Sequence, residues 1–377
     1  MVNVCFVGLY EECNYGDPII AHCTEWLYKK YKSFGSIQRL SLDYSQKHCH
    51  PSFFHHIRNK AFRFVKPNSC INYGLYYDSI SYFQKNLKNV NLIVAVGGGL
   101  IKFKAQHLHE HLSALIEVAQ EKGIDIVLNA VGVEGYDKDD ERCQFLRKRL
   151  NYSCIKHISV RDDINTLINY YLDKNHTSTI SKVSDPAVWA AEAYNIKREE
   201  NTGTIGIGIA RGNLFKDYNL NFSEEQVLGL YLDIIVQLHS IKKKIILFTN
   251  GLASDNKQLF KVLNLLQMKG LNIDYAIPSS PQSLVEIISS FDAIIATRLH
   301  SCIVAYSLNI PAIGLVWNDK LSFWGNNIGV PDNYITIENF TSPYIIDKLE
   351  KAVLRYYNQV KRTYFRNTII KDIKEYI

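Results

Sequence analysis

A strand-turn-helix-strand pattern across residues 291–316 constrains the fold of this chain more than any other part of the sequence. The apolar run at 291–296 is followed by Arg298 and His300, then by a short helical pattern and a second apolar run at 310–316. In a parallel α/β sheet such a turn lies at the carboxyl end of the strands, where ligands bind. The first N–H groups of the following helix favour an anion. The pattern therefore predicts an anion site at Arg298 and His300.

The same alternation of apolar runs and helical patterns continues along the whole chain. With 377 residues, 47% of them hydrophobic, the chain is too long for one ordinary core and long enough for two α/β domains. Alternating strands and helices imply mostly parallel sheets. We therefore predict two Rossmann-like domains, at 1–195 and 200–341, with sheets that face a central cleft. A helical segment at 342–377 is expected to pack back on the first domain.

The apolar runs predicted as strands are residues 2–9, 91–96, 124–130, 155–160, 183–188, 205–210, 244–249, 291–296 and 310–316. Helical patterns between them include residues 163–172, 223–238, 255–268 and 281–290.

Polar residues and glycines gather at the predicted carboxyl ends of these strands. They are Asn14, Gly16, Asp17, Gly97, Gly98, Gly99, Asn129, Arg161, Arg211, Asn250, Arg298 and His300. Arginines beside glycine turns suit a ligand with phosphate or carboxylate, because a guanidinium donates to both kinds of oxygen pair. Asp17 is either a helix N-cap or a carboxylate that faces a substrate hydroxyl. The glycine triplet indicates either close helix packing or close approach of a ligand.

Composition excludes some partners. The net charge of +6 is modest for this length, so nucleic acid is a poor candidate partner. The eight cysteines show no CxxC spacing, as expected of reduced cytosolic thiols, and no apolar run approaches a membrane-spanning length. A cytoplasmic location is expected. No metal or other cofactor is expected, because no DxD motif follows a predicted strand.

Residues 47–70 have an unusual composition, with five Lys or Arg, four His and four Phe and no carboxylate. Three interpretations stay open. The segment is a solvated basic insertion, or a peripheral contact with the inner face of a membrane through its phenylalanines, or a metal site. The candidate metal ligands are His48, Cys49, His50, His55 and His56, but their spacing matches no closed zinc pattern.

Five motifs are spread along the chain between the first and the last predicted strand. They are NYGD at 14–17, VGGGLI at 96–101, VRD at 160–162, SDPAVW at 184–189 and TRLHSCIVAYSLNIPAIGL at 297–315. Together they resemble the polysaccharide pyruvyl transferase family. The resemblance implies a GT-B-like pair of domains. It also implies that a pyruvyl group is transferred from phosphoenolpyruvate to two hydroxyls of one sugar, with release of phosphate. The sugar would belong to a cell-surface or capsular polysaccharide precursor.

The resemblance, together with the chemistry of the reaction and the strand-end positions, suggests roles for residues of the predicted site. The family's arginine and histidine correspond to Arg298 and His300. His300 is the candidate acid that protonates C3 of the donor, because an unperturbed imidazole titrates near neutrality, and Asp17 is the candidate base for the attacking hydroxyl. The predicted donor-binding residues are Arg298, His300, Arg211, Gly97, Gly98 and Gly99. The predicted acceptor-binding residues are Asn14, Gly16, Asp17, Asn129, Trp317 and Lys320.

Two other functions stay open on the sequence. A GT-B glycosyltransferase that uses a nucleotide sugar would share the architecture and the arginines. A catalytically silent protein that binds a glycan or a lipid-linked precursor would need no acid at His300.

Overall fold

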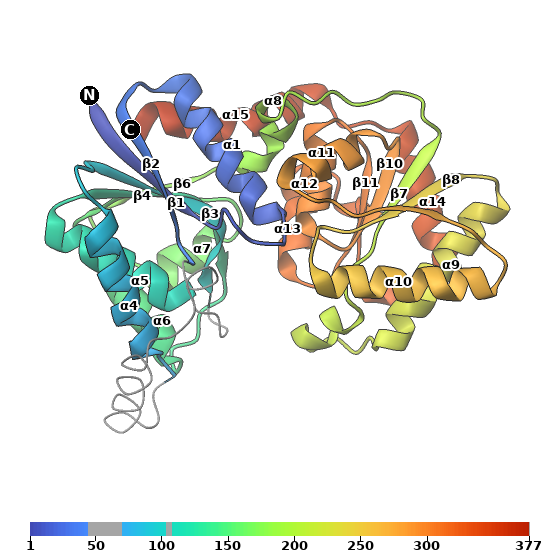
Figure 1. The fold of residues 1–377 in the computed structure, drawn as a ribbon, viewed down its shortest axis with the longest axis horizontal. Helices are drawn as coiled ribbons and strands as arrows, with labels where there is room; N and C mark the ends of the chain where they lie inside the picture. The colour runs from blue at the N-terminus through green and yellow to red at the C-terminus, as the bar shows by residue number, and fades with distance from the viewer. Residues whose placement is uncertain (44–69, 103–107, 377) are drawn as a thin grey trace. The chain divides into compact units, whose positions relative to one another are not determined.

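A computed structural model describes residues 1–43, 70–102 and 108–376 (Figure 1). Contacts between residues divide the chain into two compact units. Unit 1 comprises Met1–Glu11, Thr24–Asp185 and Thr368–Ile377, and unit 2 comprises Glu12–Cys23 and Pro186–Asn367. Both units are therefore discontinuous in sequence. The domain boundaries at 195, 200 and 341 stay a prediction.

Unit 1 contains a six-stranded parallel sheet with the order β2-β1-β3-β4-β5-β6. Its strands are β1 (Val2–Gly8), β2 (Phe34–Ser41), β3 (Leu92–Lys102), β4 (Asp125–Glu134), β5 (Ile155–Val160) and β6 (Thr179–Lys182). The central strands are buried and rich in Val, Ile and Leu, as expected when helices cover both faces of a parallel sheet.

Helices cover the sheet of unit 1 on both faces. One face packs against α4 (Tyr73–Asn86), α5 (Leu108–Lys122) and α6 (Glu141–Leu150) (Figure 1). The last turns of α1 (Gly16–Tyr31) and of α15 (Gln359–Tyr376) also belong to this unit. Asp372 of α15 contacts Nε2 of His157 in β5 at 3.0 Å. The prediction that the segment 342–377 packs on the first domain is confirmed for Thr368 onward, whereas residues 342–367 belong to unit 2.

Unit 2 contains the second six-stranded parallel sheet, with the order β12-β11-β10-β7-β8-β9. Its strands are β7 (Thr204–Gly208), β8 (Lys244–Phe248), β9 (Asp274–Ala276), β10 (Ala293–Ala296), β11 (Ala312–Leu315) and β12 (Tyr334–Ile335). In this doubly wound order the direction of strand addition reverses between β7 and β10. The carboxyl ends of these two strands are therefore the expected ligand position.

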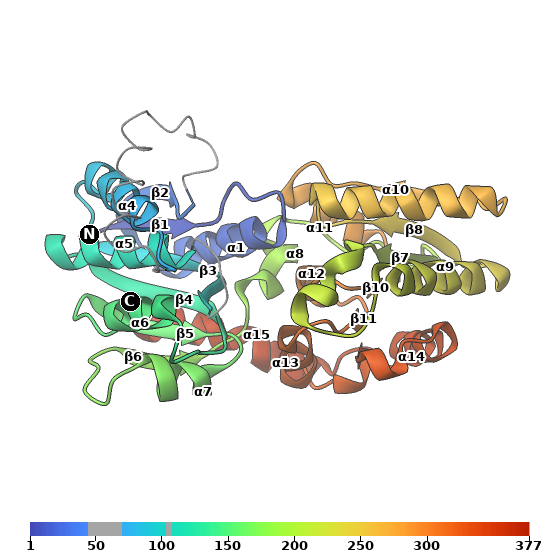
Figure 2. The ribbon, with the colours of Figure 1, turned by 90° about the horizontal axis from the view of Figure 1, so that it is seen from below.

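Two sets of helices cover the sheet of unit 2. The core on one face is shared with α9 (Glu224–Ser240), α10 (Ala253–Met268) and α14 (Ser342–Leu354). On the other, α11 (Pro281–Ser289) packs beside α12 (Leu299–Ser307), as the two views of the ribbon show (Figures 1 and 2). Ser223 caps α9 and Ser280 caps α11, each through a reciprocal capping box.

Two sequence predictions of elements are wrong and one is refined. Residues 183–188 are not a strand, because Asp185 pairs with Arg161 and Pro186 opens a 3-10 turn (Pro186–Trp189). The helix predicted at 163–172 is present as α7 (Ile164–Thr166), which continues directly into a π-helical turn (Leu167–Tyr171). The glycines at 97–99 do not follow a strand but lie inside β3.

Candidate functional site

The carboxyl ends of β7 and β10 bring two arginines to one buried carboxylate. Asp255, in the first turn of α10, has no exposed surface. Its Oδ2 accepts from Nε of Arg298 at 2.9 Å and its Oδ1 accepts from Nη2 at 2.6 Å. Oδ1 also accepts from the backbone N–H of Arg211 at 3.0 Å. One carboxylate therefore fixes both the Arg298 side chain and the loop that carries Arg211.

This geometry leaves one edge of the Arg298 guanidinium unused. Within the described residues, Nη1 of Arg298 forms no hydrogen bond, whereas Nε and Nη2 are both held by Asp255. The Arg298 side chain is 13% exposed. A guanidinium fixed on one side by a buried carboxylate can present its remaining N–H groups to an anion without first losing rotamer freedom.

Arg211 is held more loosely than Arg298. Its Nη1 donates to Oδ1 of Asn213 at 2.8 Å, and it forms an ion pair with Asp217. The Asp217 side chain is 41% exposed. Exposed ion pairs of this kind contribute only about 0–1 kcal/mol, so a ligand anion can replace Asp217 at little cost.

Aromatic residues hold the turn between β10 and α12. The side chains of Tyr231 and Thr297 share a hydrogen bond between Oη and Oγ1 at 2.8 Å, and the N–H of Ala210 donates to Oη of Tyr231 at 3.1 Å. Burial raises the pKa of Tyr231, which keeps its hydroxyl neutral. Nε1 of Trp317 donates to the carbonyl of Thr297 at 2.7 Å. Trp317 therefore holds this turn in place. Its predicted contact with the acceptor sugar would be a second, separate role.

His300 is the second residue of α12 and packs against the start of α1. It is 8% exposed. A Cβ atom placed on Gly16 would lie 2.2 Å from Nδ1 of His300, well inside van der Waals contact. Gly16 and Asp17 belong to unit 2, in the same unit as His300. The NYGD motif and the RLH motif, about 280 residues apart in sequence, therefore lie side by side in one unit.

The loop before α1 is bonded to the end of β8. The N–H of Tyr15 donates to the carbonyl of Asn250 at 3.1 Å, and Ser301 of α12 donates to Oδ1 of Asn250 at 2.5 Å. Asn250 is 1% exposed. Its Nδ2 and the Oδ1 of Asn14 are buried and have no hydrogen-bond partner within the described residues. An unused donor and an unused acceptor beside His300 favour a polar site rather than an apolar core.

Other predicted site residues belong to unit 1 or to a later helix of unit 2. Gly97, Gly98, Gly99 and Asn129 belong to unit 1. Asn129 is buried, and its Oδ1 accepts from Oη of Tyr28 at 3.1 Å. Lys320 lies half-buried in the first turn of α13 (Asp319–Asn327). The assignment of all these residues to the site stays a prediction.

Asp162 lies against Gly132 of β4 in unit 1. Its Oδ1 accepts from the N–H groups of Val133 at 2.7 Å and Asp163 at 2.8 Å. A Cβ atom on Gly132 would lie 3.0 Å from its Oδ2. Burial raises the pKa of the Asp162 carboxyl, although nearby Arg161 opposes the shift. The folded state therefore holds a proton on this carboxyl more tightly than the unfolded state does.

A raised carboxyl pKa in the folded state has a defined effect on stability. The free energy of unfolding is expected to fall as pH rises from the ordinary aspartate value of 3.8 through the raised value. Asp162→Asn keeps an acceptor for both N–H groups and cannot ionise, so this part of the pH dependence should disappear. Urea unfolding of both proteins across this pH range measures it. An unchanged pH dependence in the variant would contradict the assignment.

The profile of one protein family, described as polysaccharide pyruvyl transferase, matches residues 14–319. The chain belongs to the polysaccharide pyruvyl transferase family. The match spans both the NYGD segment packed on His300 and the β10-α12 turn that carries Arg298. The family resemblance noted in the sequence is confirmed. No curated protein matches the chain.

Solved structures share the fold of this pyruvyl transferase family member. UDP-GlcNAc 2-epimerase from Methanocaldococcus jannaschii is 13% identical, with a TM-score of 0.58 over 99% of each chain. UDP-GlcNAc 2-epimerase from Neisseria meningitidis bound to UDP-GlcNAc is 12% identical, with a TM-score of 0.58 over 100% of this chain and 99% of that one. A trehalose-6-phosphate synthase is 10% identical, with a TM-score of 0.56 over 99% and 97%. These likenesses show the GT-B fold, as predicted.

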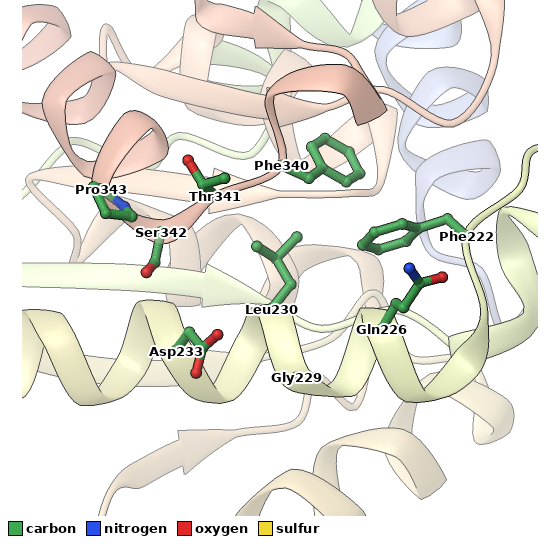
Figure 3. A pocket seen from close by; sticks show the side chains of 9 residues that line it. All are labelled: Phe222, Gln226, Gly229, Leu230, Asp233, Phe340, Thr341, Ser342 and Pro343. Atoms are coloured by element: carbon green, nitrogen blue, oxygen red, sulfur yellow. The ribbon is translucent and has the colours of Figure 1, made fainter.

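A pocket of about 450 Å³ lies between α9 and the start of α14 (Figure 3). Phe222, Phe340 and Leu230 form its apolar side, and Asp233, Thr341 and Ser342 lie toward its polar side. None of the predicted site residues of this transferase lines it. The pocket is therefore separate from the groups around Arg298 and His300.

One segment that the sequence analysis singled out lies almost wholly outside the described residues. Residues 44–69 lie outside the described residues, so the three interpretations of 47–70 stay open. Among the residues described, no helix is long and apolar enough to span a membrane. In the same residues, no group of three or more His, Cys, Asp or Glu side chains could hold a metal ion.

Proposed function

We propose that this family member moves a pyruvyl group from phosphoenolpyruvate onto two hydroxyls of one sugar in a polysaccharide precursor. The product is a cyclic ketal, and phosphate is released. C3 of the donor gains one proton, C2 forms two bonds to sugar oxygens, and the bond from C2 to the phosphate oxygen breaks. The second hydroxyl proton leaves with the phosphate. The catalyst must therefore bind an anion, supply a proton and accept one.

The observation that carries this proposal is the pairing of Arg298 with Asp255 beside His300. Arg298 is oriented by a buried carboxylate, and its Nη1 has no partner within the described residues. In this proposal Nη1 and the first N–H groups of α12 bind the phosphate or carboxylate of the donor. Arg211 leaves its exposed pair with Asp217 and binds the other anionic group.

His300 is assigned the proton transfer to C3, and Asp17 accepts the hydroxyl proton. An imidazole has an ordinary pKa near the pH of the cytoplasm, which suits a general acid. Asp17 lies in the first turn of α1, next to the glycine that packs on His300. Asn14 and Gly16 would then lie near the acceptor. Asn129, Trp317 and Lys320 as acceptor residues, and Gly97, Gly98 and Gly99 as donor residues, stay part of the proposal.

The proposal is tested by incubating the protein with phosphoenolpyruvate and a panel of lipid-linked and nitrophenyl sugars. Phosphate release together with a ketal product detected by mass spectrometry is the expected result. A binding test separates donor classes, because phosphoenolpyruvate should raise the melting temperature through linkage, whereas UDP and GDP should not. Stabilisation by UDP or GDP alone would contradict the proposal and favour a nucleotide-sugar glycosyltransferase.

Gly16→Ala is expected to lower kcat/KM by about 10²-fold, because the new methyl group must displace the His300 ring, and a displacement of about 1 Å is enough for such a loss. Steady-state kinetics with the identified acceptor measure the effect.

Gly229→Ala is the matched control, since nothing lies within 4 Å of its added Cβ in α9. The control should keep full activity and gain about 0.5–1 kcal/mol of stability. Full activity of Gly16→Ala would show that His300 tolerates displacement.

A further inference from the structure

The end of α14, the connection to α15 and the first turns of α15 expose four large apolar side chains. Leu354 is 83% exposed, Tyr356 49%, Val360 80% and Tyr364 78%. These four residues, here called the apolar ridge, lie within eleven consecutive positions of unit 2. Side chains of this size and exposure are expected singly on a soluble surface, whereas a cluster of them indicates an interaction surface.

The segment that carries the ridge is firmly attached to unit 2. Nη2 of Arg362 donates to the carbonyls of Tyr306 at 2.9 Å and Ser307 at 2.6 Å. Oη of the buried Tyr357 donates to the carbonyl of Ile310 at 3.3 Å. Val360 and Tyr364 are four residues apart on α15 and so share one helix face. The ridge is therefore presented to solvent by an anchored segment and not by a frayed end.

Within the segment that carries the apolar ridge the charge is of one sign, whereas Glu350 is exposed one helix turn before Leu354. From Lys351 to Asn367 the sequence has five Lys or Arg and no Asp or Glu. Arg362 and Arg366 use their guanidinium groups inside the unit, whereas Arg355 and Lys361 are exposed beside the ridge. Lys351 pairs with Asp347 across the exposed side of α14. Exposed apolar and aromatic side chains with cations among them fit the interface of an anionic bilayer.

We infer that the apolar ridge, with Arg355 and Lys361, binds the surface of an anionic lipid bilayer. The apolar side chains enter the boundary between headgroups and acyl chains, and the two cations stay at the level of the lipid phosphates. A polyanionic glycan would use the cations but would gain little from Leu354 and Val360, so the observations favour a bilayer. This inference does not depend on the proposed function.

The test is sedimentation of the full chain with vesicles of phosphatidylcholine alone and with vesicles that also contain phosphatidylglycerol. We expect binding to the anionic vesicles that weakens at high salt. The variant Leu354→Ser, Val360→Ser, Tyr364→Ser and the variant Arg355→Gln, Lys361→Gln should each bind on the order of tenfold more weakly. Melting temperatures of all variants are measured to show that the fold is retained.

Matched controls come from the same unit. Met268→Ser removes an apolar side chain that is 83% exposed at the end of α10, and Lys242→Gln with Lys243→Gln removes two exposed cations after α9. Both controls should bind vesicles like the unchanged protein. Three results would overturn the inference. The first is vesicle binding that the ridge substitutions leave unchanged, and the second is a soluble polyanion that displaces both variants fully from the vesicles. The third is a dimer of the unchanged protein that the ridge substitutions convert to a monomer.

Discussion

His300→Asn is expected to lower kcat for ketal formation by about 10²–10⁴-fold, the range that a positioned general acid contributes. The substitution removes the titrating group and keeps a polar side chain in the buried space against Gly16. The limb of the pH-rate profile that reports the acid should also disappear. Steady-state kinetics from acid to alkaline pH, with phosphate release as the readout, measure both effects.

His239→Asn provides the control, because His239 is exposed in the last turn of α9. Its kinetics should match those of the unchanged protein. The melting temperature of each variant separates a catalytic loss from unfolding. Normal turnover in a folded His300→Asn protein would rule out His300 as the acid. An unchanged protein without turnover would instead favour a silent glycan-binding role.

Asp255→Asn is expected to lower both stability and activity. Removing one partner of a buried ion pair costs about 3–5 kcal/mol, and the partial exposure of Arg298 places this site near the lower limit. Activity should fall by about 10²-fold because the amide keeps one acceptor oxygen but places an NH2 group against a donor of Arg298, so the guanidinium loses its fixed orientation. Urea unfolding and steady-state kinetics on the same preparation give the two values.

A double substitution separates the contribution of the Asp255–Arg298 ion pair to stability from its contribution to activity. Asp255→Leu with Arg298→Met replaces the ion pair by apolar side chains, so most of the lost stability should return while activity stays low. Asp217→Asn removes an exposed carboxylate for comparison, and it should change the free energy of unfolding by no more than about 0.5 kcal/mol. Activity that recovers together with stability in the double variant would show that Arg298 serves only the fold.

Much of the site could be predicted from sequence because strand ends are local features. The apolar runs before Arg211, Asn250 and Arg298 place these residues at the carboxyl ends of parallel strands, and the structure has β7, β8 and β10 at those positions. The doubly wound fold follows from the same alternation. The position of Arg298 and His300 relative to a strand and a helix therefore needed no tertiary information.

The contacts that give the site its detail depend on long-range packing. Asp255 looks like an ordinary first-turn acid, and only the folded chain brings it to Arg298, 43 residues away. The contact of Gly16 with His300 could not be predicted, because residues 12–23 join unit 2 although they follow the first strand of unit 1. At 97–99 the glycines were expected to end a strand, but β3 continues through them beside β4.

The division of the chain between the units has a consequence for biosynthesis. Unit 1 includes Thr368–Ile377, and the contact of His157 with Asp372 spans 215 residues. Synthesis must therefore reach Asp372 before the first sheet can gain this contact with α15. Unit 2 needs only one segment from the beginning, Glu12–Cys23, which is already outside the ribosome when the rest of that unit is synthesised. The unit whose synthesis begins first is thus the one completed last, and its sheet stays partly uncovered while the rest of the chain is synthesised.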